Sequence, residues 1–214
     1  ELSKPADTAA QLALAYSPGV AEPVRAIAQN PENVYRYTGK GNLVAVVTNG
    51  TAILGLGNLG PLASKPVMEG KALLFKRFAG IDSIDIEVKA ESSQAFIDTV
   101  VRIADTFGGI NLEDISAPRC FEIERKLKEI CDIPIFHDDQ HGTAIACLSA
   151  VLGALRFVKK DIATAKFVVN GCGAAGSAIG RLLVNMGAQN VIMVDRFGAL
   201  YEGIDAKLDR IQSY

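Results

Sequence analysis

Apolar and polar positions along the chain repeat with two periods, one typical of strands and one typical of helices. Short apolar runs bounded by turn residues predict strands, and segments with an apolar residue every three to four positions predict helices. The pattern predicts strands at residues 43–48, 52–56, 83–88, 109–115 and 133–137, helices at residues 65–78, 93–107, 119–130 and 143–158, and a βαβ unit over residues 166–195. Strands separated by helices of this length predict an α/β fold with a mostly parallel sheet covered on both sides.

Turn residues and prolines refine this outline. Prolines interrupt the short helical patterns that extend to about Asn33, and Asn49-Gly50 predicts a hairpin turn between the strands at 43–48 and 52–56. The composition contains no flexible linker, so we place the domain boundary after Asp139, where the alternation gives way to a long helix. The predicted domains are residues 1–139 and 140–214, and residues 197–214 are polar and weakly patterned.

Charge and composition exclude several classes of protein. With 22 basic and 24 acidic residues and no Lys/Arg block, the chain is not expected to bind nucleic acid. No apolar run approaches the roughly 20 residues that span a bilayer, so no membrane partner is expected. Four cysteines without a C-x-x-C pair favour reduced thiols and a cytoplasmic location. The first residues contain neither a signal-peptide core nor a starting methionine, so we expect a trimmed start.

The βαβ unit contains a pattern typical of dinucleotide-binding domains. An apolar strand leads into G-x-G-x-x-G, an apolar helix follows to Met186, and a second strand ends in an acidic residue. The first glycine permits the tight turn, the second lets the backbone approach a pyrophosphate, and the third lets helix and strand pack closely. N–H groups at the start of the helix favour phosphate, and the acid can accept from the ribose. The residues predicted to bind NAD or NADP are Gly171, Gly173, Ala174, Ala175, Gly176 and Asp195.

Two details leave alternatives open. Asp195 favours NAD, but Arg196 follows it directly and could accommodate the 2′-phosphate of NADP. A second G-x-G-x-x-G spans Gly55–Gly60, but Pro61 follows it, and the helix is predicted to begin only a few residues later. Its context favours a loop over a second phosphate-binding turn.

Two pairs of acidic residues follow predicted parallel strands. Glu113-Asp114 ends the strand at 109–115 and Asp138-Asp139 ends the strand at 133–137, so both pairs are expected at one edge of the sheet. Such pairs could be helix N-caps, but like charges gathered at one edge favour a divalent cation, and carboxylates suit Mg²⁺ or Mn²⁺. His137 and His141 flank the second pair; a zinc site would need both on one helix, and we favour structural roles.

Five segments, in order along the chain, resemble the malic enzyme family. Their sequences are most similar to its shorter bacterial-type branch. They are Ala15–Ala21 (AYSPGVA), Ile53–Gly60 (ILGLGNLG), Met68–Phe75 (MEGKALLF), Leu112–Asp114 (LED) and Phe136–Thr143 (FHDDQHGT). The resemblance implies a malic-enzyme domain followed by a partial Rossmann-like domain, and oxidative decarboxylation of malate. It further implies a homodimer.

The resemblance also implies roles for individual residues. Lys71 would be the general base at the C2 hydroxyl of malate, Tyr16 the general acid that protonates the enol carbon, and Asp138 a residue that orients or tunes Lys71. Glu113, Asp114 and Asp139 would hold Mg²⁺ or Mn²⁺. A lysine base at neutral pH needs a lowered pKa, which we expect from partial burial and a nearby cation. The glycine segment would form a substrate or cofactor loop with Gly55, Gly57, Asn58 and Gly60.

The chain departs from the family in two places. The large eukaryotic branch has an arginine that grips the substrate carboxylate, and the matching position here is Ala52. Arg25, Lys76 or a residue of a partner subunit would have to replace it. The family's dinucleotide domain also continues well beyond Asp195, so we expect a chain cut short within that domain. Two other functions therefore remain open: decarboxylation of oxaloacetate alone, and a non-catalytic fragment that acts in oligomer assembly.

Overall fold

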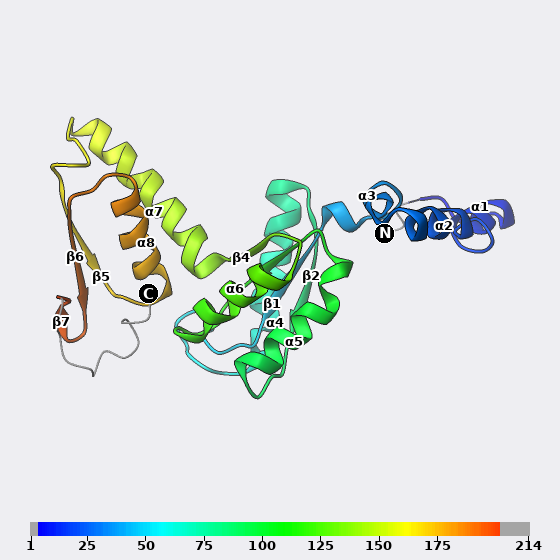
Figure 1. The fold of residues 1–214 in the computed structure, drawn as a ribbon, viewed down its shortest axis with the longest axis horizontal. Coiled ribbons are helices and arrows are strands. Elements are labelled where there is room, and N and C mark those ends of the chain that lie inside the picture. The colour runs from blue at the N-terminus through cyan, green and yellow to red at the C-terminus, as the bar shows by residue number, and fades with distance from the viewer. Residues whose placement is uncertain (1–3, 202–214) are drawn as a thin grey trace. The chain divides into compact units, whose positions relative to one another are not determined.

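The computed structural model describes residues 4–201. Its contacts divide the chain into two units, Glu1–Leu43 and Val44–Tyr214. The first unit consists of short helical elements, none of which contains a buried residue: α1 (Ala9–Ala15), α2 (Ala21–Gln29), η1 (Pro31–Asn33), α3 (Val34–Tyr37) and η2 (Lys40–Asn42) (Figure 1). Thr8 caps α1 in a reciprocal pair with Gln11, in which each side chain accepts from the backbone N–H of the other. The predicted short helices are confirmed.

The second unit contains a four-stranded sheet in the order β2-β1-β3-β4. Its strands are β1 (Leu43–Thr48), β2 (Asp82–Glu87), β3 (Gly109–Leu112) and β4 (Ile135–His137). Pairing is parallel between β1 and β3 and between β3 and β4, with Val47 opposite Leu112 and Leu112 opposite His137. The segments that follow these three strands therefore leave the sheet at the same edge.

Helices connect the strands and bury the sheet. They are α4 (Pro61–Leu74) with η3 (Phe75–Ala79), α5 (Ser93–Ile103) with η4 (Ala104–Thr106), α6 (Arg119–Ile130) and α7 (Asp138–Phe157). Every residue of β3 is buried, as expected of a central strand covered on both faces. The α/β prediction is confirmed, and the bounds of α6 match the predicted helix. However, α4 begins four residues earlier than predicted and α7 five residues earlier.

The predicted return strand at residues 52–56 is wrong. This segment is a loop with one isolated bridge between Ile53 and Gly57. Leu54, Gly55 and Gly57 all have positive φ, a left-handed conformation that extended strands do not contain. Gly50 also has positive φ, and a Cβ there would lie 2.2 Å from the Gly60 carbonyl oxygen. Only glycine permits this close approach, which closes the loop at its base.

A second sheet follows α7. It consists of β5 (Lys166–Asn170), β6 (Asn190–Asp195) and the short β7 (Gly198–Ala199), and α8 (Ala174–Asn185) connects the first two strands. Pairing of β5 and β6 is parallel, which confirms the predicted βαβ unit and its Rossmann-like topology. The antiparallel β7 was not predicted from the weakly patterned sequence. Among the residues described, no helix is both long and apolar enough to cross a bilayer.

Candidate active site

The site is built around the junction of β4 and α7, where no connecting residue separates strand from helix. His137 ends β4 and is the N-cap of α7, so Asp138 and Asp139 are the first two helical residues. The side chain of His137 makes no cap hydrogen bond. Carboxylates in a first turn are favoured by the helix dipole. The first turn of α7 therefore holds both acids at the edge of the sheet.

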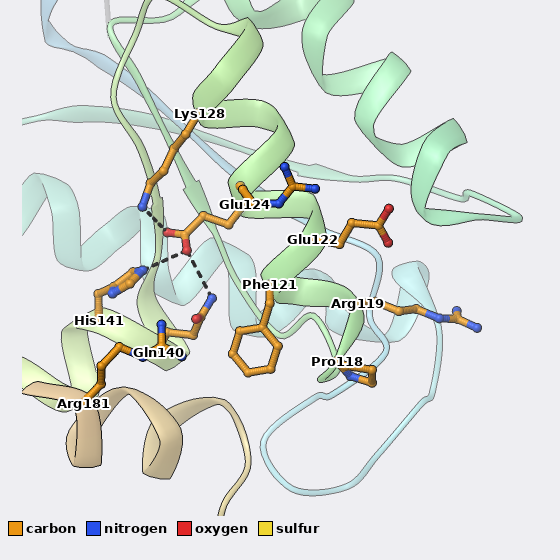
Figure 2. Close-up of a pocket in the computed structure, with 10 residues that line it drawn as sticks. Pro118, Arg119, Phe121, Glu122, Glu124, Lys128, Gln140, His141 and Arg181 are labelled. Carbon is orange, nitrogen blue, oxygen red and sulfur yellow. Dashed lines mark hydrogen bonds and ion pairs between the residues drawn. The ribbon is translucent and has the colours of Figure 1, made fainter. Parts of the chain in front are cut away.

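On the α6 side of this junction lies Glu124, a buried carboxylate with four donors (Figure 2). Its Oε1 accepts from the His137 backbone N–H at 3.0 Å and from Lys128 Nζ at 2.8 Å. Its Oε2 accepts from Gln140 Nε2 at 3.3 Å and contacts His141 Nε2 at 2.8 Å. Burial acts to raise the pKa of Glu124, but the Lys128 and His141 contacts outweigh it and hold the pKa below its ordinary value. The sequence prediction missed this residue.

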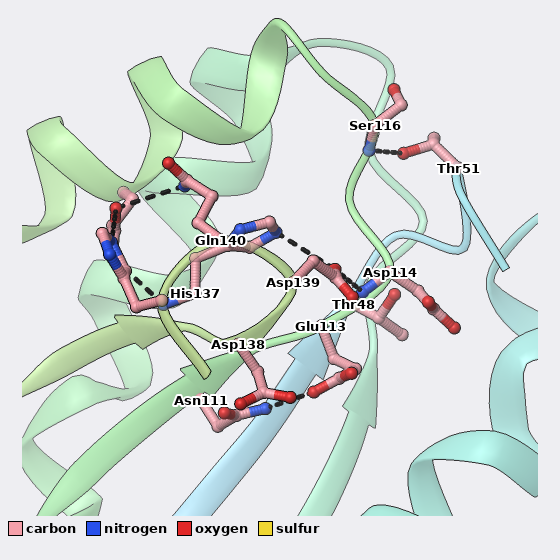
Figure 3. Close-up of polar contacts among 12 residues, drawn as sticks. Thr48, Thr51, Asn111, Glu113, Asp114, Ser116, His137, Asp138, Asp139 and Gln140 are labelled. Atoms are coloured by element: carbon pink, nitrogen blue, oxygen red, sulfur yellow. Dashed lines mark hydrogen bonds and ion pairs between the residues drawn. The ribbon is translucent and has the colours of Figure 1, made fainter. Parts of the chain in front are cut away.

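On the other side, three carboxylates converge (Figure 3). Glu113, Asp114 and Asp139 each present an oxygen, and these oxygens all lie within 4.8 Å of one another. The backbone N–H of Asp114 donates to Asp139 Oδ2 at 2.9 Å, which ties the end of β3 to the first turn of α7. Asp114 has a φ of 52°, and its buried Oδ2 has no hydrogen-bond partner. The predicted gathering of the two acid pairs at one edge is confirmed.

The electrostatics of this triad fit a divalent cation. Burial, followed by the charges of neighbouring carboxylates, raises the pKa of Asp139 to about 6. Burial also raises the pKa of Glu113 to about 7, against the opposing hydrogen bond from Asn111 and charge of Lys71. An oxygen-only donor set suits Mg²⁺ or Mn²⁺, and a cation would relieve both the desolvation and the repulsion. A cation there would also give the unpartnered Asp114 oxygen a partner.

Lys71, on α4, lies between the two acid pairs. Its Nζ donates to Asp138 Oδ2 at 2.7 Å and lies 3.1 Å from Glu113 Oε2. Burial acts to lower the pKa of Lys71, but the hydrogen bond to Asp138 and the charge of Glu113 outweigh it, so the pKa lies above its ordinary value. The expected lowering is therefore not found in the protein residues alone. The expected partial burial of Lys71 is found. Asp138 contacts Lys71, and its role in orienting or tuning this lysine stays a prediction.

Two further residues fix the geometry of this cluster, and the sequence prediction missed both. The Asn111 amide donates to Glu113 Oε2 at 2.8 Å from a buried position on β3. Gly142 lies one turn after Asp138 on α7, and a Cβ there would lie 1.9 Å from Asp138 Oδ1. The D-D-x-x-G spacing was a signal for the second residue, because positions i and i+4 of a helix share a face.

The two histidines do not form a zinc site. His137 is fully buried, and its Nε2 lies 3.4 Å from Asp139 Oδ2. Burial lowers the pKa of His137 to about 4, so the ring is neutral at physiological pH. His141 points to Glu124 instead, and its ring lies against Phe136 at a centroid distance of 5.5 Å. Both contacts are those of structural side chains, in agreement with the sequence prediction.

The glycine loop is attached to the acid triad through Asp114. The Ala52 N–H donates to the Asp114 carbonyl at 3.0 Å, and Leu54 donates from its backbone to the Asp114 carboxylate. The Ser116 N–H donates to Thr51 Oγ1 at 2.9 Å. These bonds bring the segment with Ala52 beside the predicted metal ligand. A role in substrate or cofactor binding for Gly55, Gly57, Asn58 and Gly60 stays a prediction.

Tyr16 belongs to the first unit. It follows α1, its backbone N–H donates to the Leu12 carbonyl at 2.9 Å, and 76% of its surface is exposed. Arg25 and Lys76, the candidate substrate-binding cations, form ion pairs with Glu22 and Asp82 respectively. The catalytic role of Tyr16 and the identity of the carboxylate-binding cation stay predictions.

The turn between β5 and α8 has the geometry that its three glycines require. Gly171 has a φ of 105°, and a Cβ on Gly176 would lie 1.6 Å from the Gly171 carbonyl oxygen. A Cβ on Gly173 would meet no heavy atom within 4 Å, which leaves its backbone open to a ligand. Ala174 and Ala175 lie in the first turn of α8, where the free N–H groups of a helix start favour an anion. Asp195 ends β6, and its Oδ1 accepts from the Arg196 N–H at 2.7 Å.

Comparisons with known proteins agree with this arrangement. The model of the malic enzyme N-terminal domain matches residues 2–95 and 89–128, and that of the glutamate/leucine/phenylalanine/valine dehydrogenases matches residues 135–214. An NADP-dependent malic enzyme of Halomonas elongata is 67% identical over 95% of this chain and 49% of its own length. An NAD-dependent malic enzyme of Rhizobium meliloti is 57% identical over 97% of this chain and 27% of its own length.

A solved structure gives the same result. The crystal structure of a malic enzyme from Pyrococcus horikoshii superposes with a TM-score of 0.89 and 52% identity, over 95% of this chain and 47% of that one. The chain thus spans about half the length of the Halomonas and Pyrococcus proteins and about a quarter of the Rhizobium protein. From the family model that matches more than half of its residues and from these relatives, the chain belongs to the malic enzyme family.

Proposed function

We propose that this chain carries the metal-dependent centre of an oxidative decarboxylase, which converts malate and NAD or NADP to pyruvate, CO₂ and the reduced nucleotide. The observation that carries the proposal is the contact of Lys71 with Asp138 and Glu113 beside the acid triad. A basic group adjacent to a divalent-metal site suits removal of a proton from a bound hydroxyl. The names of the Halomonas and Rhizobium relatives support malate as substrate and both nucleotides as cofactors.

Glu113, Asp114 and Asp139 would hold Mg²⁺ or Mn²⁺ through their carboxylate oxygens. The bound cation would supply positive charge that offsets these carboxylates and polarises the oxygen of the substrate. Burial acts to lower the pKa of Lys71, and the carboxylates of Asp138 and Glu113 act to raise it. A cation beside these carboxylates would weaken their effect, so that burial would count for more. The pKa of Lys71 would then fall toward the range that a general base needs at neutral pH.

Lys71 would accept the proton of the C2 hydroxyl while the C2 hydride passes to the nicotinamide ring. The hydrogen bond to Asp138 holds Nζ in place for this transfer. Loss of CO₂ from C3 leaves the enol of pyruvate, and protonation at C3 completes the reaction. We assign that protonation to Tyr16, on the strength of its place in the A-Y-S-P-G-V-A segment.

The nucleotide would bind at the turn between β5 and α8, with its pyrophosphate against the N–H groups of Ala174 and Ala175. Asp195 can accept from a ribose hydroxyl through its second carboxylate oxygen, which favours NAD. Arg196 places its guanidinium 4.7 Å from the centre of the Phe197 ring, beside Asp195, where a 2′-phosphate would be accommodated. We keep NAD as the preferred and NADP as the alternative cofactor.

Two further parts of the proposal concern the assembly and location of the protein. We propose a homodimer, in which a cation of the partner subunit could supply the substrate contact that Ala52 lacks. The four cysteines are free thiols, which supports the reducing environment of the cytoplasm.

The decisive experiment removes the proposed base. In the complete natural polypeptide that contains these residues, Lys71→Ala should lower kcat for malate-dependent nucleotide reduction by roughly 100- to 10,000-fold. Lys65 is a matched control: it lies on the same helix and pairs with Asp85 at 2.5 Å, outside the acid triad. Lys65→Ala should retain activity, and a Lys71→Ala enzyme that oxidises malate normally would refute the assignment.

The same preparations separate the competing functions. If the unaltered protein decarboxylates oxaloacetate but does not oxidise malate, the function is decarboxylation of oxaloacetate alone. The acid triad and Lys71 could support that reaction without a nucleotide. Failure in both assays, together with no Mn²⁺ binding by calorimetry, would favour a non-catalytic role in assembly.

A further inference from the structure

The first turn of α7 has an unusual cap. In a capping box, the residue at the third helical position reaches back to the backbone N–H of the N-cap residue. Gln140 occupies that third position in α7 but makes a different bond. The N–H of His137, the N-cap residue, donates instead to Glu124, which belongs to α6. A carboxylate from another helix thus takes the place of the local cap.

Glu124 contacts the first turn of α7 at several points. Besides the His137 N–H, it accepts from the side chain of Gln140 and contacts the ring of His141, as Figure 2 shows. Its fourth partner, Lys128, lies on its own helix α6. Three of the four contacts therefore join Glu124 to β4 and α7. An ordinary surface ion pair within one helix contributes little to stability and would need none of these three contacts.

In the first turn of α7, the two acids of the proposed centre are followed directly by two residues that contact Glu124. Asp138 bonds to Lys71 and Asp139 to the backbone of Asp114, whereas Gln140 and His141 turn to Glu124. A single turn of helix moves as one piece, because its backbone hydrogen bonds fix the relative positions of its residues. Whatever sets the position of Gln140 and His141 also sets that of the two acids.

We propose that Glu124 is a positioning residue, which fixes the first turn of α7 so that Asp139 reaches the metal and Asp138 reaches Lys71. The inference rests on the proposed metal-dependent function of this centre. Partners beyond the direct ligands typically change metal affinity 10- to 100-fold when they are removed. Glu124 contacts no proposed ligand directly and would act on Asp139 through the backbone of one helical turn.

The test compares Mn²⁺ affinity with folding stability in the complete natural polypeptide. Glu124→Ala removes all four contacts and should weaken Mn²⁺ binding roughly 10-fold or more, measured by calorimetry where the protein is fully folded. Glu124→Gln keeps an acceptor for the His137 N–H and should restore most of that affinity, to within about 3-fold. Glu122→Ala is the matched control, because Glu122 is exposed, pairs with Lys126 one turn later and points away from α7 in Figure 2.

A purely structural Glu124 gives a different result. Urea unfolding of the same variants would then show lower stability for Glu124→Ala while Mn²⁺ affinity stays within twofold of the unaltered protein, which overturns the proposal. Destabilisation alone does not change the affinity of molecules that remain folded. If Glu124→Ala does not fold, His141→Ala decides the matter. It removes one of the contacts that join Glu124 to α7, and an affinity within twofold of the unaltered protein would be equally contradictory.

One more variant keeps this inference separate from the proposed function. Asp139→Ala should abolish high-affinity Mn²⁺ binding. Retained binding in Asp139→Ala would refute the metal site itself. Lost binding in Asp139→Ala beside unchanged binding in Glu124→Ala would refute only the positioning role.

Discussion

The contact of Asp138 with Lys71 is made beside a glycine one helical turn later, Gly142. The Asp138 carboxylate occupies the space that a side chain at Gly142 would fill. At the scale of single residues, the site therefore depends on an absent methyl group as much as on the charges that are present. Asp138 and Gly142 both belong to α7, so the steric conflict would arise within this helix alone.

We expect Gly142→Ala to displace Asp138 and to lower kcat for malate oxidation about 100-fold, because misplacement by about 1 Å can have that effect. Gly153→Ala on the same helix is the control, since a Cβ there meets no heavy atom within 4 Å. That control should gain roughly 0.5–1 kcal/mol of stability from helix propensity. Equal activity of the two variants in a spectrophotometric assay would show that Asp138 is not displaced or not needed.

The raised pKa values of the triad predict how metal binding varies with pH. Glu113 titrates at about 7 and Asp139 at about 6, and each must lose its proton to bind a cation. Mn²⁺ affinity should therefore fall on the order of 10- to 100-fold between pH 8 and pH 5.5. Calorimetric titration at the two pH values measures this change directly. An affinity that is the same at both would contradict the burial of these carboxylates.

At the scale of elements, the two glycines at the start of α8 have separable tasks. A Cβ on Gly176 would collide with the Gly171 carbonyl, whereas a Cβ on Gly173 would meet nothing within the protein. Gly176→Ala should therefore lower the melting temperature and abolish nucleotide binding. Gly173→Ala should leave the melting temperature nearly unchanged but weaken nucleotide binding, because it crowds the approach of the pyrophosphate. Fluorescence titration with the reduced nucleotide and calorimetric melting distinguish the two effects, and equal melting temperatures would contradict the first.

Much of the element order could be predicted because the responsible signals are local. The apolar and polar pattern of residues 119–130 gave both ends of α6, and the acid pairs were placed at one edge because parallel strands end there. The predicted domain boundary after Asp139 stays a prediction. It lies within the first turn of α7, whereas the contacts divide the chain after Leu43.

The features that sequence analysis missed depend on distant residues or on backbone conformation. The start of α7 was placed five residues late, because its cap comes from Glu124, thirteen residues before His137. The loop at residues 52–56 has the apolar pattern of a strand, but the positive φ of Leu54 and its bond to Asp114 prevent strand pairing. The raised pKa of Lys71 needs the three-dimensional contact with Asp138, which no periodicity reveals.

At the scale of the whole molecule, the buried acids make stability depend on pH. Burial raises the folded-state pKa of Glu113 from 4.5 to about 7, so the folded protein holds a proton that the unfolded chain releases between these values. The contribution of this group to stability is complete below about pH 4.5 and is lost as the pH rises through about 7. Asp139 acts in the same direction between 3.8 and about 6.

We therefore expect the metal-free protein to lose roughly 3–5 kcal/mol from these two groups between pH 4.5 and pH 7.5. Urea unfolding in the presence of a chelator measures this loss. A Glu113→Gln variant should show a shallower decline, because its amide does not titrate. Addition of Mn²⁺ at pH 7.5 should restore stability in the unaltered protein, and a metal-free stability that rises over this range would contradict the prediction.

The direct passage from β4 into α7 has a mechanical consequence. With 20 residues, α7 is about 30 Å long, and it packs along α8 of the nucleotide-binding half. Contacts with Asp114 and Glu124 hold the first turn of α7, so a helix of this length would act as a lever. A tilt of about 5° at its first turn would shift its far end by about 3 Å, given its rise of 1.5 Å per residue. Small adjustments of the carboxylates around a cation would thereby be amplified at the far end of α7.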